Sequence, residues 1–341
     1  MKVLLVGNDF DYSLELIYAK YLRKLGFIVE IYGIRGKFFD IINNSLLNKI
    51  ESNISNYRIY KNLNSDLIKF TQIFQPKVIF VFKGMEVLPS SLKFFRYNNI
   101  LLLNFNPDNP FIFSGKGSGN NNVKNSIKIF DHHFTYNLDT LEKLRALKLS
   151  CSYLPFGHDL PSKLVNELEQ VKKINKLCFL GNPDKHRVKL IKSIVNSGIS
   201  IDLYGNYWAN ITKSWENSAV KAFGPVYGND FWRILNKYRF QLNILRPHNI
   251  DSHNMRSYEI AAVGSIGLHP DNQEHKLMYQ HGINAFLYNK NNLIETLVTI
   301  FNLSTQTVEG ISKKAKDTAE TKGFHYENRA KAVSEIIRGK I

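Results

Sequence analysis

Residues 243–269 read NILRPHNIDSHNMRSYEIAAVGSIGLH and alternate apolar and polar segments. The stretch begins with an apolar run, continues as a polar loop and a short helical stretch from about Met255, and ends with Gly264 and a second apolar run. Continuous apolar runs that are joined by a helix are typical of parallel strands buried on both faces. The stretch therefore predicts a strand–helix–strand unit of a parallel sheet.

The same alternation extends through the rest of the chain in two series. We expect strands at 2–6, 27–33, 77–82 and 100–105 in the first half, and at 176–180, 199–204, 240–245, 265–268 and 285–288 in the second. Two such series predict an α/β protein with two Rossmann-like domains that face a cleft, whose ligands bind beyond the carboxyl ends of the strands. We expect the first domain to cover 1–160, the second 161–320, and a C-terminal helix in 321–341 to pack back on the first.

The composition fits a folded protein with two cores and leaves several classes of partner open. The 341 residues are 44% hydrophobic, and no apolar run approaches the roughly 20 residues that span a bilayer. The N-terminus reads as a first strand because a secretory signal needs a longer apolar segment. Two cysteines form no disulfide framework, which fits a reducing cytoplasm. The net charge of +16 would suit phosphate-bearing substrates, an anionic membrane surface or nucleic acid, although no arginine-rich block is present.

Two charged residues in the quoted stretch point to a phosphate-bearing ligand. Arg256 and Glu259 are three residues apart and therefore share one face of the predicted helix. A guanidinium beside a helix N-terminus suits a pyrophosphate, and a carboxylate one turn later can accept hydrogen bonds from ribose hydroxyls. The alternative is an intrahelical ion pair on a solvated face. The apolar residues at 260–263 speak against that alternative, because they predict a buried helix.

Residues 254–264, NMRSYEIAAVG, resemble the HNxRxFEIPACG segment of the CgeB-like glycosyltransferases, which belong to the two-domain, fold-B (GT-B) glycosyltransferases. In that wider group an acidic residue and seven others precede the glutamate, and this chain has Asp251 and Glu259 at that spacing. The resemblance implies that Glu259 holds the donor ribose and that Asp251 lies near the transferred sugar. Asp251 stands where the wider group more often has glutamate.

Three further segments resemble the same family, in the same order along the chain. Residues 153–159 (YLPFGHD) resemble its interdomain stretch, residues 177–187 (LCFLGNPDKHR) the opening of its C-terminal domain, and residues 201–208 (IDLYGNYW) its LYGxxW segment. Gly181 and Gly205 also follow predicted strands, where a missing side chain lets backbone N–H groups approach a phosphate; the alternative is a plain turn glycine. The resemblance implies that the second domain binds the donor through Gly181, Asn182, Arg187, Tyr204, Gly205, His253, Asn254, Arg256, Tyr258 and Glu259.

The resemblance implies a metal-independent, hexosyltransferase-like enzyme. Such an enzyme would move a sugar from a UDP- or GDP-linked donor to a cell-envelope glycan or lipid-linked acceptor, as in lipopolysaccharide or capsule biogenesis, without a cofactor. We expect a cytoplasmic protein whose basic surface can hold it at the inner face of the membrane, and no nucleic-acid partner. The alternatives are a nucleotide-sugar epimerase, which would act on the donor without an acceptor, and a non-catalytic basic binding protein.

Acidic residues follow two predicted strands of the first domain and suit the acceptor side. Asp108 is the candidate for the base that deprotonates the acceptor hydroxyl, so Asp108 and Asp251 are the predicted catalytic residues. A role in an Asx turn is equally open for Asp108. Asn8, Asp9 and Asp11 follow the first strand and are expected to contact the acceptor. Their D-x-D pattern is also a metal-binding signature, but capping of the next helix is the more common role, so no metal is predicted.

Overall fold

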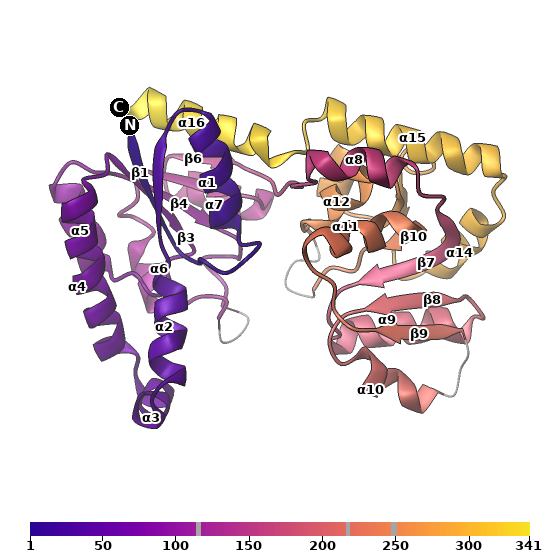
Figure 1. Cartoon of the computed structure of the whole chain (residues 1–341), viewed down its shortest axis with the longest axis horizontal. Helices are drawn as coiled ribbons and strands as arrows, with labels where there is room; N and C mark the ends of the chain where they lie inside the picture. The colour runs from indigo at the N-terminus through magenta and orange to yellow at the C-terminus, as the bar shows by residue number, and fades with distance from the viewer. Residues whose placement is uncertain (114–116, 216–218, 247–250) are drawn as a thin grey trace. The chain divides into compact units, whose positions relative to one another are not determined.

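The computed structural model describes residues 1–113, 117–215, 219–246 and 251–341 (Figure 1). The chain divides into two compact units, of which unit 1 comprises Met1–Pro155 and Tyr326–Ile341 and unit 2 comprises Phe156–His325. The structural division therefore falls between residues 155 and 156, where the sequence placed it at residue 160. Within the described residues, no helix is both long enough and apolar enough to cross a membrane.

Unit 1 is a six-stranded sheet in the order β2-β1-β3-β4-β5-β6, in which all neighbouring strands are parallel. The order reverses between β1 and β3, which places a topological switch point there. The strands are β1 (Lys2–Val6), β2 (Ile28–Tyr32), β3 (Val78–Phe82), β4 (Leu101–Asn106), β5 (His132–Thr135) and β6 (Cys151–Tyr153). The helices are α1 (Leu14–Lys24), α2 (Ile34–Asn43), α3 (Leu46–Ile54), α4 (Tyr57–Phe74), α5 (Pro89–Tyr97), α6 (Asn121–Ser126), α7 (Leu138–Ala146) and α16 (Tyr326–Lys340).

The last helix, α16, belongs to unit 1 although it follows unit 2 in the sequence. Its first residue, Tyr326, meets the ring of Tyr18 on α1 at 5.8 Å between centroids. At its other end Arg338 donates a hydrogen bond of 3.1 Å to the carbonyl of Leu25. Packing along its length therefore attaches α16 to α1.

Unit 2 is a second six-stranded parallel sheet, in the order β12-β11-β10-β7-β8-β9. Its order reverses between β10 and β7, which is the switch point of the Rossmann arrangement. The strands are β7 (Ile174–Leu180), β8 (Ile201–Tyr204), β9 (Val220–Phe223), β10 (Tyr238–Leu242), β11 (Ile266–Pro270) and β12 (Phe286–Tyr288). The helices are α8 (Ser162–Glu169), α9 (Lys185–Asn196), α10 (Trp208–Thr212), the 3-10 turn η1 (Lys213–Trp215), α11 (Gly228–Lys237), α12 (Arg256–Ala262), α13 (Gln273–Met278), α14 (Leu293–Phe301) and α15 (Thr305–Thr321).

Apart from the first three residues of β7, the central strands of both sheets are buried along almost their whole length, as the apolar runs of most of them predict; β5, which reads HHFT, is buried without such a run. The edge strands β6 and β9 were not expected from the sequence. Both are only partly buried, and β9 alternates between half-buried and exposed residues. A short edge strand needs no continuous apolar run, so its sequence carries little signal.

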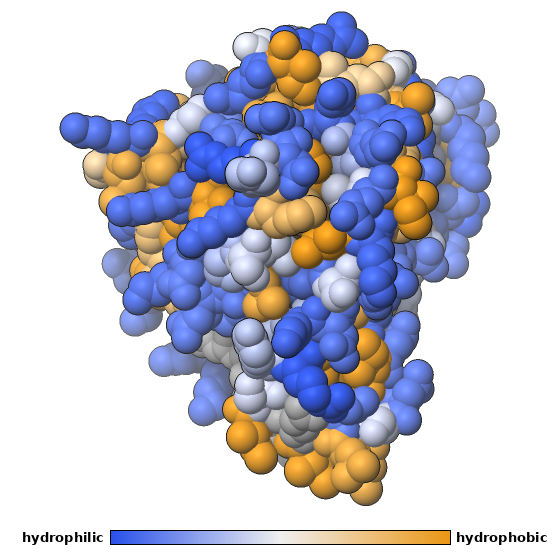
Figure 2. Space-filling model, turned by 90° about the vertical axis from the view of Figure 1, so that its left-hand side faces the viewer, coloured by the Kyte–Doolittle hydropathy of each residue, from blue (hydrophilic) through white to orange (hydrophobic). Residues whose placement is uncertain are grey.

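One helix of unit 1 departs from the usual arrangement of apolar residues. The helix α3 exposes several large apolar side chains, and Figure 2 shows apolar side chains gathered at the lower end of the face on view, where α3 lies in Figure 1. Exposed leucine and isoleucine residues on one helix are an unusual feature for a surface that faces water.

Candidate functional site

Three arginines gather at the switch point of unit 2, beyond the carboxyl ends of β7 and β10. Arg187 lies in the first turn of α9, Arg246 is exposed shortly after β10, and Arg256 opens α12. Burial lowers the pKa of the Arg187 guanidinium, Asp184 raises it, and the charges of Arg246 and Arg256 lower it further. Arg187 therefore lies within electrostatic reach of the other two guanidinium groups, and this concentration of positive charge favours an anion at this place.

The Arg187 guanidinium donates hydrogen bonds to the backbone of the loops that follow β7 and β10. It donates to the carbonyl of Ile244 after β10, at 3.3 Å from Nε and 2.9 Å from Nη2. Nη1 donates to the carbonyl of Asn182 after β7 at 2.9 Å, and Asp184 lies 3.4 Å from Nε. Arg187 was predicted to lie near the donor phosphates. The structure gives it a bracing role that fixes the two loops in position, behind the more exposed Arg246 and Arg256.

Arg256 and Glu259 form an ion pair of 2.6 Å within α12, in largely buried surroundings. The Arg256 guanidinium also lies over the ring of Phe231, at 4.4 Å from the centroid. Burial raises the pKa of the Glu259 carboxyl, whereas the Arg256 charge lowers it. The Nε of Arg256 is buried and has no hydrogen-bond acceptor among the described residues, so this donor is unsatisfied. The intrahelical ion pair is therefore present, but it lies on a largely buried face of α12 and not on a solvated one.

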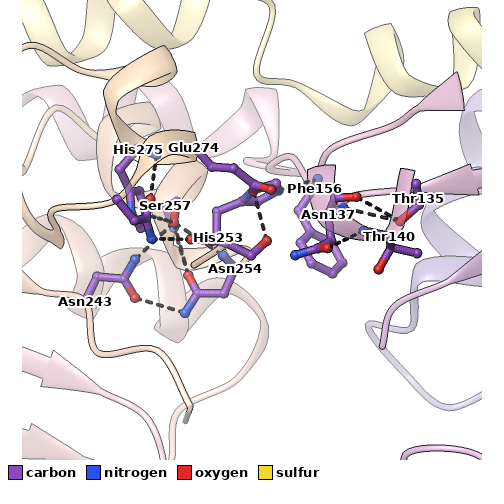
Figure 3. Close-up of polar contacts among 12 residues, drawn as sticks. Thr135, Asn137, Thr140, Phe156, Asn243, His253, Asn254, Ser257, Glu274 and His275 are labelled. Carbon is purple, nitrogen blue, oxygen red and sulfur yellow. Dashed lines mark hydrogen bonds and ion pairs between the residues drawn. The ribbon is translucent and has the colours of Figure 1, made fainter. Parts of the chain in front are cut away.

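The helix α12 has only seven residues, so its dipole adds little to the field of the guanidinium groups. Its start is fixed by side chains that stand out in Figure 3. Asn254 Oδ1 accepts the N–H of Ser257 at 3.1 Å, and Asn254 Nδ2 donates to Asn243 Oδ1 at 2.9 Å. Ser257 Oγ in turn lies 2.9 Å from His275 Nε2 on α13. Asn254, a predicted donor residue, therefore ties α12 to the end of β10.

The side chains of His253 and Tyr258 are buried beneath the segment that joins β10 to α12. His253 is fully buried, its Nδ1 is hydrogen-bonded to Glu274 on α13, and its Nε2 accepts the backbone N–H of Phe156 at 3.3 Å (Figure 3). The Tyr258 ring packs edge-on against His253 and Phe324, at 5.2 Å and 4.9 Å between centroids. Both side chains were predicted to bind the donor, and the structure instead places them as supports of the loop. Glu274, which holds His253, was not singled out in the sequence.

The glycines after β7 and β8 pack against each other. Gly205 has φ +155°, and a Cβ at this position would lie 2.5 Å from the carbonyl oxygen of Gly181. The N–H of Gly181 donates a hydrogen bond of 2.9 Å to the backbone carbonyl of Tyr204. The carbonyl of Gly181 accepts a hydrogen bond of 2.7 Å from Trp208 Nε1. Asn182 Oδ1 accepts the N–H of Asn206 at 2.9 Å. Close approach of two loops is thus a sufficient physical reason for Gly205.

Two other predicted residues of unit 2 lie in contrasting surroundings. Tyr204 is buried in the core, where its hydroxyl lies 3.0 Å from that of Tyr238 and its ring stacks on Phe223 at 4.7 Å. A contact between the Tyr204 side chain and a donor does not fit this position. Asp251 is exposed at the first described position after residues 247–250, and Arg246, the last described position before them, is exposed as well.

Unit 1 has a pocket of about 230 Å³ at its own switch point, beyond β1 and β3. Its polar lining combines carboxylates with cations and includes Asn8, Ser13, Glu15, Arg35, Lys83 and Glu86. Arg35 and Glu86 form an ion pair of 2.8 Å, and burial raises the pKa of the Glu86 carboxyl while Arg35 lowers it. The second cation, Lys83, lies 2.5 Å from Asp108. Each cation of this pocket is therefore matched by a carboxylate.

Glu15 is the residue of this pocket that sequence reasoning missed. It is buried, and its Oε1 accepts the N–H of Asn8 at 2.6 Å. A Cβ at Gly7 would lie 2.2 Å from the same oxygen, so the glycine that ends β1 makes room for the carboxyl. Burial raises the pKa of Glu15 to about 7, against the lowering effect of the Asn8 N–H and the Arg35 charge. The available signal was an acidic residue in the first turn of a helix that follows a strand-ending glycine.

The predicted acceptor-side residues lie around this pocket in different roles. Asp108 pairs with Lys83, and the Asx turn here belongs to Asn106, whose Oδ1 accepts the N–H of Asp108 at 3.0 Å. Asp9 is exposed, and a Cβ at Gly33 would lie 1.9 Å from its Oδ2, so its carboxylate packs against the start of α2. Asp11 is exposed. Helix capping by this acidic pair is wrong, because Ser13 caps α1 by accepting the N–H of Leu16 at 3.4 Å.

Comparison with known proteins points to one class of fold. Residues 187–335 match a protein family described as glycosyl transferase-like. The sequence matches no curated protein.

Several solved structures share the fold over nearly the whole chain. Sucrose-phosphate synthase from Thermosynechococcus elongatus is 9% identical, with 99% of this chain and 98% of that chain covered and a TM-score of 0.70. Anabaena HepE in complex with UDP is 13% identical, with 99% and 100% covered and a TM-score of 0.64. UDP-GlcNAc 2-epimerase from Neisseria meningitidis bound to UDP-GlcNAc is 14% identical, with 99% and 100% covered and a TM-score of 0.63.

These likenesses confirm the predicted fold of two Rossmann-like domains of GT-B type. The family match shows a glycosyl transferase-like sequence over residues 187–335, and the neighbours show the fold. Neither distinguishes the CgeB-like subfamily, which stays a prediction.

Proposed function

We propose that this protein is a hexosyltransferase that transfers a sugar from a UDP- or GDP-linked donor to a hydroxyl of a cell-envelope glycan or lipid-linked acceptor. The observation that carries the proposal is the gathering of Arg187, Arg246 and Arg256 at the switch point of unit 2, with the carboxyl of Glu259 one turn along α12. A diphosphate and a ribose are the two parts of a nucleotide-sugar that such groups recognise. HepE in complex with UDP-glucose is a structural neighbour that supports a donor of this class.

On the donor side, Arg256 and Arg246 bind the diphosphate, and the Glu259 carboxylate accepts hydrogen bonds from the ribose hydroxyls. The guanidinium groups stabilise the charge that develops on the leaving diphosphate, so the proposed transfer needs no divalent metal and no cofactor. Arg187 holds the loops after β7 and β10 in place for this contact. Asp251 is proposed to lie near the transferred sugar, as the resemblance to CgeB-like enzymes implies.

On the acceptor side, we place the base at Glu15 instead of Asp108. The Asp108 carboxylate is engaged by the Lys83 ammonium at 2.5 Å, whereas Glu15 has a pKa of about 7 and forms no ion pair within 4.0 Å among the described residues. A carboxyl with such a pKa suits proton transfer near neutral pH. The acceptor O–H bond breaks and its proton passes to Glu15 as the oxygen bonds to the anomeric carbon. The bond from that carbon to the diphosphate oxygen breaks, and its electron pair leaves with the diphosphate.

A nucleotide-sugar epimerase is the second candidate, because UDP-GlcNAc 2-epimerase bound to UDP-GlcNAc is also a structural neighbour. The two candidates differ in what they need. An epimerase changes the sugar of the donor in the absence of any acceptor, whereas a transferase releases the nucleoside diphosphate and requires a hydroxyl to complete the reaction. The non-catalytic alternative predicts binding of the nucleotide without release of either product.

The experiment is a screen of the full chain against UDP-, GDP-, CDP- and dTDP-sugars. Thermal stabilisation identifies the nucleobase of the donor, and mass spectrometry then follows the donor with and without saccharide acceptors. We expect stabilisation by a UDP- or GDP-linked sugar and release of the diphosphate that accelerates with acceptor. Isomerised donor without acceptor would establish the epimerase, and stabilisation without turnover would establish the binding protein.

A further inference from the structure

The helix α3 displays the apolar side of an amphipathic helix to solvent. Leu46, Leu47, Ile50 and Ile54 are 77%, 78%, 56% and 85% exposed. Positions 46, 50 and 54 follow one another at intervals of four residues, so these side chains share one face, with Leu47 beside them. A soluble domain gains nothing from this arrangement, because four large apolar groups remain in water.

The same helix is attached to unit 1 by its polar side. Asn48 is half-buried, and its Nδ2 donates to the carbonyl of Ile41 on α2 at 3.1 Å. Its Oδ1 accepts a hydrogen bond of 2.8 Å from Arg58 on α4. A helix that covers a core normally packs with its apolar face inward and its polar face in water. In α3 the orientation is reversed, and it is held by specific hydrogen bonds.

We infer that α3 docks unit 1 onto an anionic lipid bilayer, with its apolar face inserted at the level of the headgroups. Helices that lie in the membrane interface combine an apolar face with flanking basic residues. The helices α2, α3 and α4 together carry six basic residues against three acidic ones, Asp40, Glu51 and Asp66, within a chain of net charge +16. An anionic surface thus matches both the apolar and the charged parts of this region.

A second copy of the chain fits the exposed face less well than a bilayer. A stable interface buries about 800 Å² on each partner, and four side chains on a nine-residue helix offer less than that. Two copies would also bring together the same basic residues, which repel each other. The apolar face therefore matches a surface that it can enter without needing a large complementary partner.

Docking by α3 is a property of unit 1 that needs no sugar donor, so its test is independent of the proposed transfer. The full chain is mixed with unilamellar vesicles of phosphatidylcholine, either alone or with phosphatidylglycerol, and the bound fraction is measured by flotation. We expect binding to the vesicles that contain phosphatidylglycerol, weaker binding to pure phosphatidylcholine, and partial release by high salt.

The decisive variant carries Leu46→Gln, Leu47→Gln, Ile50→Gln and Ile54→Gln, which removes the apolar face without a change in charge. Glutamine is a good helix former and the four positions are exposed, so the fold should persist, as circular dichroism and an unchanged melting temperature will establish. We expect this variant to bind anionic vesicles at least about tenfold more weakly than the wild type. The matched control carries Ile73→Gln and Tyr97→Gln, which are 82% and 88% exposed at the ends of α4 and α5, and should bind like the wild type.

Two results would overturn the inference. The first is a wild-type chain that does not float with anionic vesicles, or a quadruple variant that floats as well as the wild type. The second is a concentration-dependent dimer in sedimentation velocity that the quadruple variant abolishes, because the apolar face would then belong to a contact between copies.

Discussion

The two Rossmann-like units carry opposite chemistry at the same topological place. At the switch point of unit 2, Arg187 lies within electrostatic reach of Arg246 and Arg256, and the neighbouring carboxylates are those of Asp184 and Glu259. At the switch point of unit 1, Arg35 and Lys83 are each paired with a carboxylate, and Glu15 is buried beside them. The first arrangement favours an anion and the second favours neutral hydroxyl groups, which is the difference in charge that the proposed donor and acceptor sites require.

The largest expected effect comes from Glu15→Gln, which removes the base from the unit 1 pocket. We expect kcat for transfer to fall by about 10²–10⁴-fold, because a positioned general base contributes that much. Donor affinity should not change, because the proposed donor site lies in unit 2. The rate of the wild type should rise with pH through about 7, where Glu15 loses its proton, and this limb should vanish in the variant.

Glu30→Gln, at an exposed position of β2, is the matched control and should leave kcat unchanged. An unaltered kcat and pH profile in Glu15→Gln would show that Glu15 is not the base, and would leave the proposed donor site untouched.

The pH dependence of stability tests the same residue without any substrate. The folded chain holds the Glu15 proton up to about pH 7, whereas the ordinary pKa is 4.5. The unfolded chain therefore binds fewer protons in this window, and the free energy of unfolding falls as pH rises from about 4.5 to 7. The contribution of Glu15 is about 2–3 kcal/mol, which Glu15→Gln should remove. Urea unfolding of the wild type and of Glu15→Gln at pH 4.5 and pH 7 measures the difference. If the free energy of unfolding changes equally with pH in both proteins, the pKa of Glu15 is not raised in the folded chain.

Arg256→Ala tests the anionic character of the unit 2 site. We expect a loss of about 1.5–3 kcal/mol in the binding of a nucleoside diphosphate, and a much smaller loss for the nucleoside. The single variant also leaves the Glu259 carboxylate buried without its ion-pair partner. The double variant Arg256→Ala, Glu259→Gln is therefore measured as well, because it removes both charges. Arg233→Ala, which removes an exposed arginine paired with Glu167 and Asp230, is the control. Equal losses for nucleoside and diphosphate would argue against a phosphate contact.

The smallest effect concerns the loops after β7 and β8. Gly205→Ala should lower the free energy of unfolding by about 1–3 kcal/mol, because the added methyl group meets the Gly181 carbonyl. Gly224→Ala, where a Cβ has open space, should have little effect. If Gly205→Ala unfolds like the wild type but loses donor affinity, the glycine serves the ligand and not the loop contact.

The fold was predictable because most of the central parallel strands have apolar runs, whereas the central strand β5 (HHFT) and the half-exposed edge strands β6 and β9 have none. In the site, the spacing of Arg256 and Glu259 correctly indicated a shared face of a buried helix. Motif similarity could not tell which way Tyr204 and His253 point, and both side chains turn into the interior. Glu15 was missed because its environment is assembled from Gly7, Arg35 and Glu86, which are brought together only by the fold.

The most direct test of the central claim is isothermal titration of UDP and GDP into the full chain in the presence of EDTA. We expect saturable binding of at least one of the two diphosphates, unchanged when Mg²⁺ replaces EDTA, and weakened in Arg256→Ala but not in Arg233→Ala. Binding that appears only with a divalent metal, or that survives Arg256→Ala unchanged, would contradict a donor site built on the arginines of unit 2.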